Sequence, residues 1–141
     1  MSDYLEIEAE ESEYLYKDTS QIPNSGFGLF SAIDIIKGEI ISVFEGEILT
    51  DNEAEKRVNQ GIDQYFINLL DGTIMDSKNI DCYAKLANDA EGFGKSGFKN
   101  NAEIALDNED NPCIVATKNI KSGDELFCGY GKKYWEKHGQ N

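Results

Sequence analysis

The chain has 141 residues, with 27 acidic and 13 basic side chains and a formal charge of −14. This length fits one domain, because a single core of this size buries enough apolar surface to offset chain entropy. The few Lys and Arg residues are scattered, so we expect no surface for phosphate backbones and no direct nucleic acid ligand. The acidic surface either attracts a basic peptide partner or serves only solubility.

The first elements are predicted to be an acidic tail and short strands. Residues 1–13 are charge-dense, so we expect a loosely attached tail there, with the domain beginning at Tyr14. In SGFGLFSAI (25–33) and IIKGEIISVFEGEIL (35–49), β-branched and aromatic residues alternate between glycine turn signals. This pattern predicts strands.

One helix is predicted next, followed by a hairpin. Thr50 and Glu53 form a capping box and Gly61 provides a stop signal, which predicts a short helix between them. The strand-like runs QYFINLL and TIMDS are separated by Asp71 and Gly72, the dipeptide typical of a tight hairpin turn.

The second half is predicted to mix one helical segment with more strands. Residues 80–90 carry apolar side chains at helical spacing, and a glycine-rich loop follows them. NAEIAL (101–106) and PCIVATKNI (112–120) are predicted strands joined by an NEDN turn. KSGDELFCGYG (121–131) indicates a turn and a strand, and KKYWEKHG a final turn or two of helix. These elements predict a mainly β domain, α+β with little helix.

Several familiar sites are excluded by the residues. The GFG segment at 26–28 lacks the third glycine of a dinucleotide fingerprint and is followed by a predicted strand. No Walker or nucleophile-elbow motif is present, and His138, the only histidine, lies too near the end for a hydrolytic triad. The three cysteines, which include no CxxC pair, fit neither a disulfide framework nor a zinc site, so we expect no metal.

Reduced thiols also favour an intracellular protein, nuclear or cytoplasmic. The amino terminus lacks the features of a secretory signal, and no apolar run reaches membrane-spanning length, so we expect no membrane association. The oligomeric state is not readable from the sequence.

Four segments in order resemble the SET-domain family of protein lysine methyltransferases. They are the GxG segment followed by a strand and GE (25–49), ANDA (87–90), NAE (101–103), and GDELFCGYG (123–131), which is similar to the closing signature GEELxxDYG. The likeness runs from about Tyr14 to Trp135, leaving residues 136–141 as a short tail. It implies a fold of several small β-sheets, a β-clip, with a carboxy-terminal pseudoknot that brings ANDA beside GYG.

The resemblance also implies a reaction and its residues. The chain is expected to transfer a methyl group from S-adenosylmethionine to a lysine of a protein or peptide, either a histone or another basic protein. The residues implied to bind the cofactor are Gly26, Phe27, Gly28, Asn88, Asp89, Tyr130 and Trp135, of which Tyr130 is also implied to be catalytic. Tyr65 is implied to be the second catalytic residue, which lines the channel that admits the lysine.

Three positions depart from the family pattern. Asp89 replaces the usual histidine, Phe44 stands where many members have tyrosine, and Cys128 occupies a position that often limits how many methyl groups are added. An alternative therefore stays open, namely a catalytically inactive SET-like acidic module that binds basic proteins.

Overall fold

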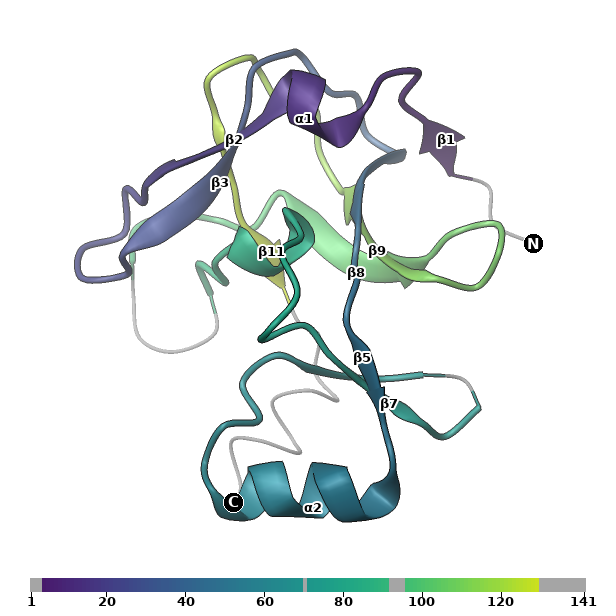
Figure 1. The fold of residues 1–141 in the computed structure, drawn as a ribbon. Coiled ribbons are helices and arrows are strands. Elements are labelled where there is room, and N and C mark those ends of the chain that lie inside the picture. The colour runs from purple at the N-terminus through teal and green to yellow at the C-terminus, as the bar shows by residue number, and fades with distance from the viewer. Residues whose placement is uncertain (1–3, 70, 92–95, 130–141) are drawn as a thin grey trace.

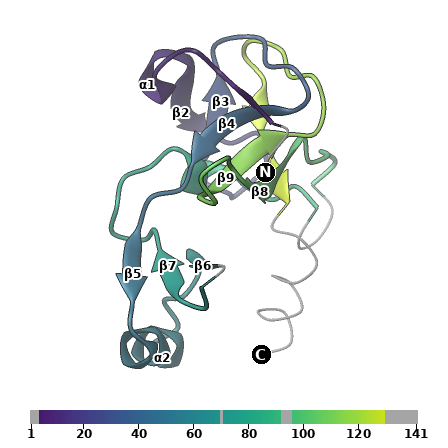
Figure 2. The same cartoon turned by 90° about the vertical axis from the view of Figure 1, so that its right-hand side faces the viewer.

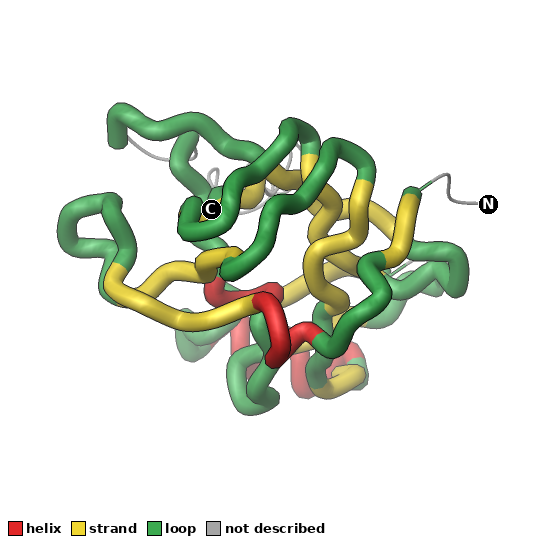
Figure 3. Tube along the Cα trace, turned by 90° about the horizontal axis from the view of Figure 1, so that it is seen from above, coloured by secondary structure: helices red, strands yellow, loops and turns green. Residues whose placement is uncertain are grey.

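A computed structural model of the protein describes residues 4–69, 71–91 and 96–129. Short strands and loops dominate it, and helix contributes little (Figures 1 and 3). The elements in chain order are β1 (Leu5–Glu6), α1 (Glu11–Tyr14), β2 (Leu15–Thr19), β3 (Phe27–Ser31), β4 (Glu39–Val43), β5 (Glu47–Leu49), α2 (Asp51–Asn59), β6 (Phe66–Asn68), β7 (Ile74–Asp76), the 3₁₀ turn η1 (Ala84–Leu86), β8 (Ala102–Leu106), β9 (Pro112–Ala116), β10 (Glu125–Leu126) and β11 (Cys128–Gly129). The expected mainly β class with several small sheets is confirmed.

The described strands form three sheets. One has the order β1-β4-β9-β8-β11, a second β10-β3-β2, and a third β5-β7-β6. Strand β3 therefore lies between β2, its neighbour along the chain, and β10, which comes almost a hundred residues later. The predicted hairpins form as expected, β6 with β7 and β8 with β9. The third sheet lies with α2 at one end of the molecule, away from the other two sheets (Figures 1 and 2).

The core forms where the apolar faces of the first two sheets meet η1. Its members share near-complete burial, and they include Leu29, Ile41, Ile114, Leu126 and Cys128. Such side chains contribute roughly 1.5–3 kcal/mol each on burial. This packing fixes the positions of β3 and β10, which carry the site described below.

The segment before Tyr14 is more ordered than the loosely attached tail expected from its charge. Strand β1 pairs with β4, and the Glu11 carboxylate accepts hydrogen bonds from the Ser42 hydroxyl and the Val43 amide. This segment is therefore ordered despite its charge density, because strand β4 provides backbone and side-chain hydrogen-bond partners for it.

The helix expected over residues 80–90 is mostly absent, and that prediction is wrong. Only Ala84–Leu86 is helical, as a 3₁₀ turn, because Ala87 is extended with φ −69° and ψ 125°. The residue after it, Asn88, forms a parallel β-bridge with Phe127. A long-range pairing therefore overrides the local spacing.

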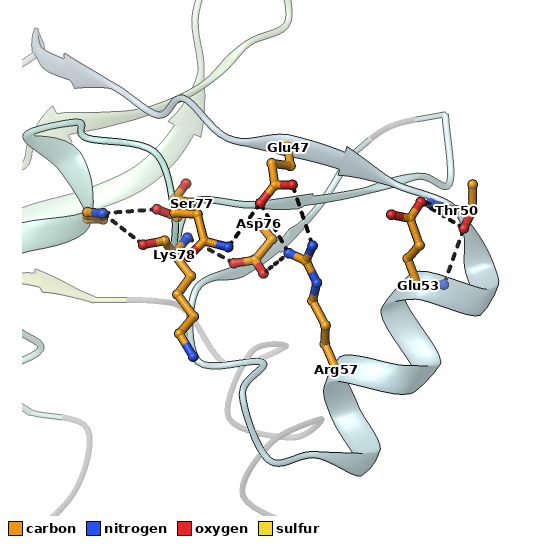
Figure 4. Close-up of polar contacts among 9 residues, drawn as sticks. Glu47, Thr50, Glu53, Arg57, Asp76, Ser77 and Lys78 are labelled. Atoms are coloured by element: carbon orange, nitrogen blue, oxygen red, sulfur yellow. Dashed lines mark hydrogen bonds and ion pairs between the residues drawn. The ribbon is translucent and has the colours of Figure 1, made fainter.

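Helix α2 forms as predicted and is tied to the third sheet by charge (Figure 4). Thr50 and Glu53 make the capping box. The Arg57 guanidinium donates to the fully buried Asp76 carboxylate at 2.6 Å and to Glu47 at 3.3 Å. These bonds hold the helix against β5 and β7.

In the described part of the chain, no helix is both long and apolar enough to cross a membrane.

Candidate cofactor and substrate site

The GFG segment lies where a seven-residue loop joins β2 to β3. Gly26 has φ +64°, a conformation that side chains with a Cβ rarely adopt. Its carbonyl accepts from the Ser20 amide at 2.8 Å, which closes the loop at the start of β3. Apart from its chain neighbours, no atom of the described residues lies within 4 Å of where a Cβ on Gly26 would be, so this part of the chain leaves room for a ligand there.

Asn88, which lies 61 positions after Phe27 in the sequence, contacts the same segment. Its side-chain amide donates to the Phe27 carbonyl at 3.0 Å, and its own carbonyl accepts from the Cys128 amide at 2.9 Å. The end of η1 thus connects the GFG segment to the last described strand. The predicted cofactor residues at 26–28 and 88 are brought together in this way.

Gly28 is packed for a reason that the sequence did not reveal. A Cβ at this position would lie 3.0 Å from Glu125 Cδ and 3.4 Å from the Asn88 amide nitrogen, and closer still to Glu125 Oε2. The family resemblance implied that this glycine binds the cofactor. In the structure its missing side chain makes room for a buried carboxylate.

Glu125 was missed by sequence reasoning, although it lies in the closing motif. Its side chain is only 2% exposed. One oxygen accepts from the Ser20 hydroxyl at 2.7 Å and the other from the Gln21 amide at 2.7 Å. Nothing local predicted its burial or pointed to partners more than a hundred residues earlier.

Asn101, part of the NAE segment, fixes the path of the last strands. Its side-chain nitrogen donates to the Glu125 carbonyl at 3.0 Å, and its side-chain oxygen accepts from the Phe127 amide at 2.8 Å. One amide therefore satisfies two backbone groups around Leu126, and it holds the strand that precedes residue 130 in register.

Asp89, in place of the family's histidine, makes contacts within its own loop. Its Oδ1 accepts from the Asn100 side chain at 2.9 Å and from the Glu91 amide at 2.9 Å. The Asn100 oxygen in turn accepts from the Ala90 amide at 2.8 Å. These bonds order the loop beside Asn88.

Tyr65 and Phe44 line a small cavity of about 10 Å³, roughly the volume that one water molecule needs. Ser77 and Lys85 line it as well, and the Lys85 ammonium lies 5.9 Å from the centre of the Tyr65 ring. The Ser77 hydroxyl is the one buried side-chain polar atom without a hydrogen-bond partner among the described residues. Aromatic rings, the Ser77 hydroxyl and the Lys85 side chain therefore share the lining of this cavity.

A wider groove of about 860 Å³ opens between α1, β2 and η1. Four carboxylates line it, together with two tyrosines and two lysines: Glu10, Glu11, Glu45, Asp81, Tyr16, Tyr83, Lys17 and Lys85. Acidic and aromatic groups in one groove suit a cationic ligand better than an anionic one.

Two predicted site residues, Tyr130 and Trp135, lie outside the described residues. The described chain ends at Gly129, one residue before the tyrosine. The pseudoknot predicted for the carboxy-terminal segment also lies largely outside the described residues. Across residues 4–69, 71–91 and 96–129, no three His, Cys, Asp or Glu side chains group as metal ligands would.

Comparison with known proteins identifies the family. The SET domain family model matches residues 26–131. The Histone-lysine N-methyltransferase EZH2 of Chaetomium thermophilum is 30% identical over 128 residues, which cover 82% of this chain and 8% of that protein. The chain therefore spans less than a tenth of this relative.

Solved structures agree with this assignment. A humanized mutant of the Chaetomium thermophilum Polycomb Repressive Complex 2, bound to the inhibitor GSK343, aligns with a TM-score of 0.67 and 28% identity over 83% of this chain and 15% of the other. The same complex bound to the inhibitor GSK126 gives the same values. The motifs, the small sheets and these matches all agree, and the chain belongs to the SET domain family.

Proposed function

We propose that this protein is a protein lysine N-methyltransferase that uses S-adenosylmethionine. The observation that carries the proposal is the meeting of GFG, Asn88 and the last described strand, joined by the Asn88–Phe27 and Cys128–Asn88 hydrogen bonds. Three motifs that are far apart in the sequence thereby converge on one place. Such convergence is what a binding site built from separate motifs requires.

The residues present fit the proposed cofactor. The open space at Gly26 and the exposed Phe27 ring, 58% accessible, leave room for a ligand against the backbone of this segment. Gly26, Phe27, Gly28 and Asn88 would hold the cofactor, with Asp89 ordering the loop and Trp135 packing against the adenine. When bound, S-adenosylmethionine supplies a methyl group already activated by its sulfonium.

The protein's own task is then to orient a neutral lysine amine and exclude water. A lysine in water has a pKa of about 10.4 and is almost fully protonated near neutral pH. Loss of water from the amine when it is buried against Tyr65 and Phe44 would disfavour the charged ammonium and so lower that pKa. Tyr130 is the residue proposed to align the amine through its hydroxyl.

The substrate proposed is a basic protein segment, such as a histone tail. The carboxylates of the groove between β2 and η1 would attract Lys and Arg side chains on either side of the target. Histone is also the substrate named for the Chaetomium relative. The location proposed is nuclear for a histone substrate, and nuclear or cytoplasmic for another basic protein.

Incubation with methyl-labelled S-adenosylmethionine and a panel of basic peptides tests this function. We expect label on a lysine side chain. Tyr130→Phe should lose most turnover while its cofactor affinity stays near that of the wild type, since the hydroxyl orients the amine and does not anchor the cofactor. Unchanged turnover in this variant would remove Tyr130 from the mechanism.

The second candidate is an inactive acidic module that binds basic proteins. The observation favouring it is that Asp89, which replaces histidine, uses its Oδ1 within its own loop. This candidate predicts peptide binding without cofactor binding. Calorimetry with S-adenosylmethionine alone therefore separates the two functions before any activity assay.

A further inference from the structure

We propose that Glu125 is an electrostatic positioning residue, whose buried negative charge favours the cationic sulfonium of the cofactor over a neutral thioether. This inference rests on the proposed function, since it concerns the cofactor of that same site. It assigns a role to the Glu125 side chain, which occupies the space beside Gly28 of the GFG segment.

The hydrogen bonds around Glu125 show which oxygens accept. The Ser20 hydroxyl donates to Glu125 Oε2 at 2.7 Å and itself accepts from the Ile22 amide at 3.2 Å. The Gln21 amide can only donate, and it donates to Oε1. Because both oxygens act as acceptors, the side chain is bound in the manner of an ionised carboxylate.

This charge has no cationic partner in the described chain. The ion pairs found there join Arg57 to Glu47 and Asp76, at the far end of the molecule. A buried charge is costly unless it is paired or used. Two neutral donors reduce the cost of burying Glu125, but they leave its net negative charge in place.

The position of the charge links it to the cofactor segment. The carboxylate fills the space that a side chain at Gly28 would take, and the Asn88 amide borders the same space. Gly28 follows Phe27, whose carbonyl Asn88 holds. Glu125 therefore lies against Gly28, in the segment proposed to bind the cationic cofactor. It is buried in a low-dielectric core, where a charge acts over longer distances than in water.

Calorimetric binding of two ligands tests the idea. S-adenosylmethionine carries the sulfonium, whereas S-adenosylhomocysteine is its neutral thioether and keeps the remaining groups. The variants are Glu125→Gln, which removes the charge at nearly constant shape, and Ser20→Ala, which removes the hydrogen bonds of the hydroxyl to Glu125 and Ile22 and keeps the charge. Glu125→Met replaces the Gln variant if circular dichroism shows that the latter is unfolded.

Removal of the charge should weaken the binding of S-adenosylmethionine about tenfold, because a buried unit charge acts on a nearby cation through a medium of lower effective dielectric constant than water. Binding of S-adenosylhomocysteine should change by less than about twofold, and Ser20→Ala should keep the wild-type ratio of the two affinities. Equal weakening of both ligands by Glu125→Gln would show a merely structural residue and overturn the inference alone. A wild-type protein that binds neither ligand would overturn the proposed function as well.

Discussion

Substitution of Gly28 by alanine tests how tightly the cofactor segment is packed. The new methyl group would lie 3.0 Å from Glu125 Cδ and nearer to Oε2, so the carboxylate would have to move. It cannot move freely, because Ser20 and Gln21 each hold one of its oxygens. A hydrogen bond to a charged group contributes about 1.5–3 kcal/mol, and overpacking a core costs about 1–3 kcal/mol.

We therefore expect Gly28→Ala to lower the free energy of unfolding by about 3 kcal/mol, measured by urea denaturation, and the melting temperature by roughly 10 °C. The double variant Gly28→Ala with Glu125→Asp should recover part of this loss, because the shorter acid withdraws from the added methyl group. Wild-type stability in Gly28→Ala, or a double variant no better than the sum of its parts, would refute this account of the contact.

Other predictions concern separate parts of the molecule. Asn101→Ala should cost about 2–3 kcal/mol of unfolding free energy, since it frees the Glu125 carbonyl and the Phe127 amide together, and hydrogen exchange of the Phe127 amide should speed up; a change below about 0.5 kcal/mol would contradict this. Arg57→Met should destabilise the protein near neutral pH. The hydrogen bond from Arg57 holds the pKa of Glu47 below its usual value. The Arg57–Glu47 pair therefore stabilises the fold above about pH 4.3, and this stabilisation disappears as pH falls through the lowered pKa. Urea denaturation should show the stabilities of the wild type and Arg57→Met converging in acid, and a stability difference independent of pH would argue against a role for the pair. A thiol reagent near pH 8 should modify Cys82 first in the native protein, because burial raises the pKa of the other two thiols, Cys113 to about 11 and Cys128 higher; rapid reaction of all three before unfolding would contradict their burial.

The elements that sequence predicted well are those decided by neighbours along the chain. The capping box at Thr50 and Glu53 and the turn at Asp71 and Gly72 each need only a few adjacent residues. In both cases the turn or cap chemistry and the apolar pattern agree, so no tertiary contact has to overrule them.

The errors occur where distant segments decide the outcome. Residues 80–90 have the apolar spacing of a helix, but the pairing of Asn88 with Phe127 makes the end of that segment extended. Similarly, residues 5–13 have the composition of a tail, yet β4 provides partners for β1 and Glu11. Neither partner could be inferred from local composition.

The motifs of the candidate site could be predicted from the sequence, but the buried residues that hold them in place could not. GFG and Asn88 were recognised from their order along the chain, and the structure joins them through one hydrogen bond. The role of Glu125 required knowledge that residues 20, 28 and 125 meet, which involves separations of about a hundred positions. The sites proposed at Tyr130 and Trp135 stay predictions.

The placement of β3 between β2 and β10 has a consequence for biosynthesis. A ribosome releases the chain from its amino end, so β3 has its second neighbour only after residues 125 and 126 of β10 have emerged. Until then one edge of this strand is unpaired, and the apolar residues Leu29 and Leu126 cannot meet. We expect this domain to fold slowly for its size and only after β10 has emerged, with chaperone dependence concentrated in nascent chains that end before residue 125.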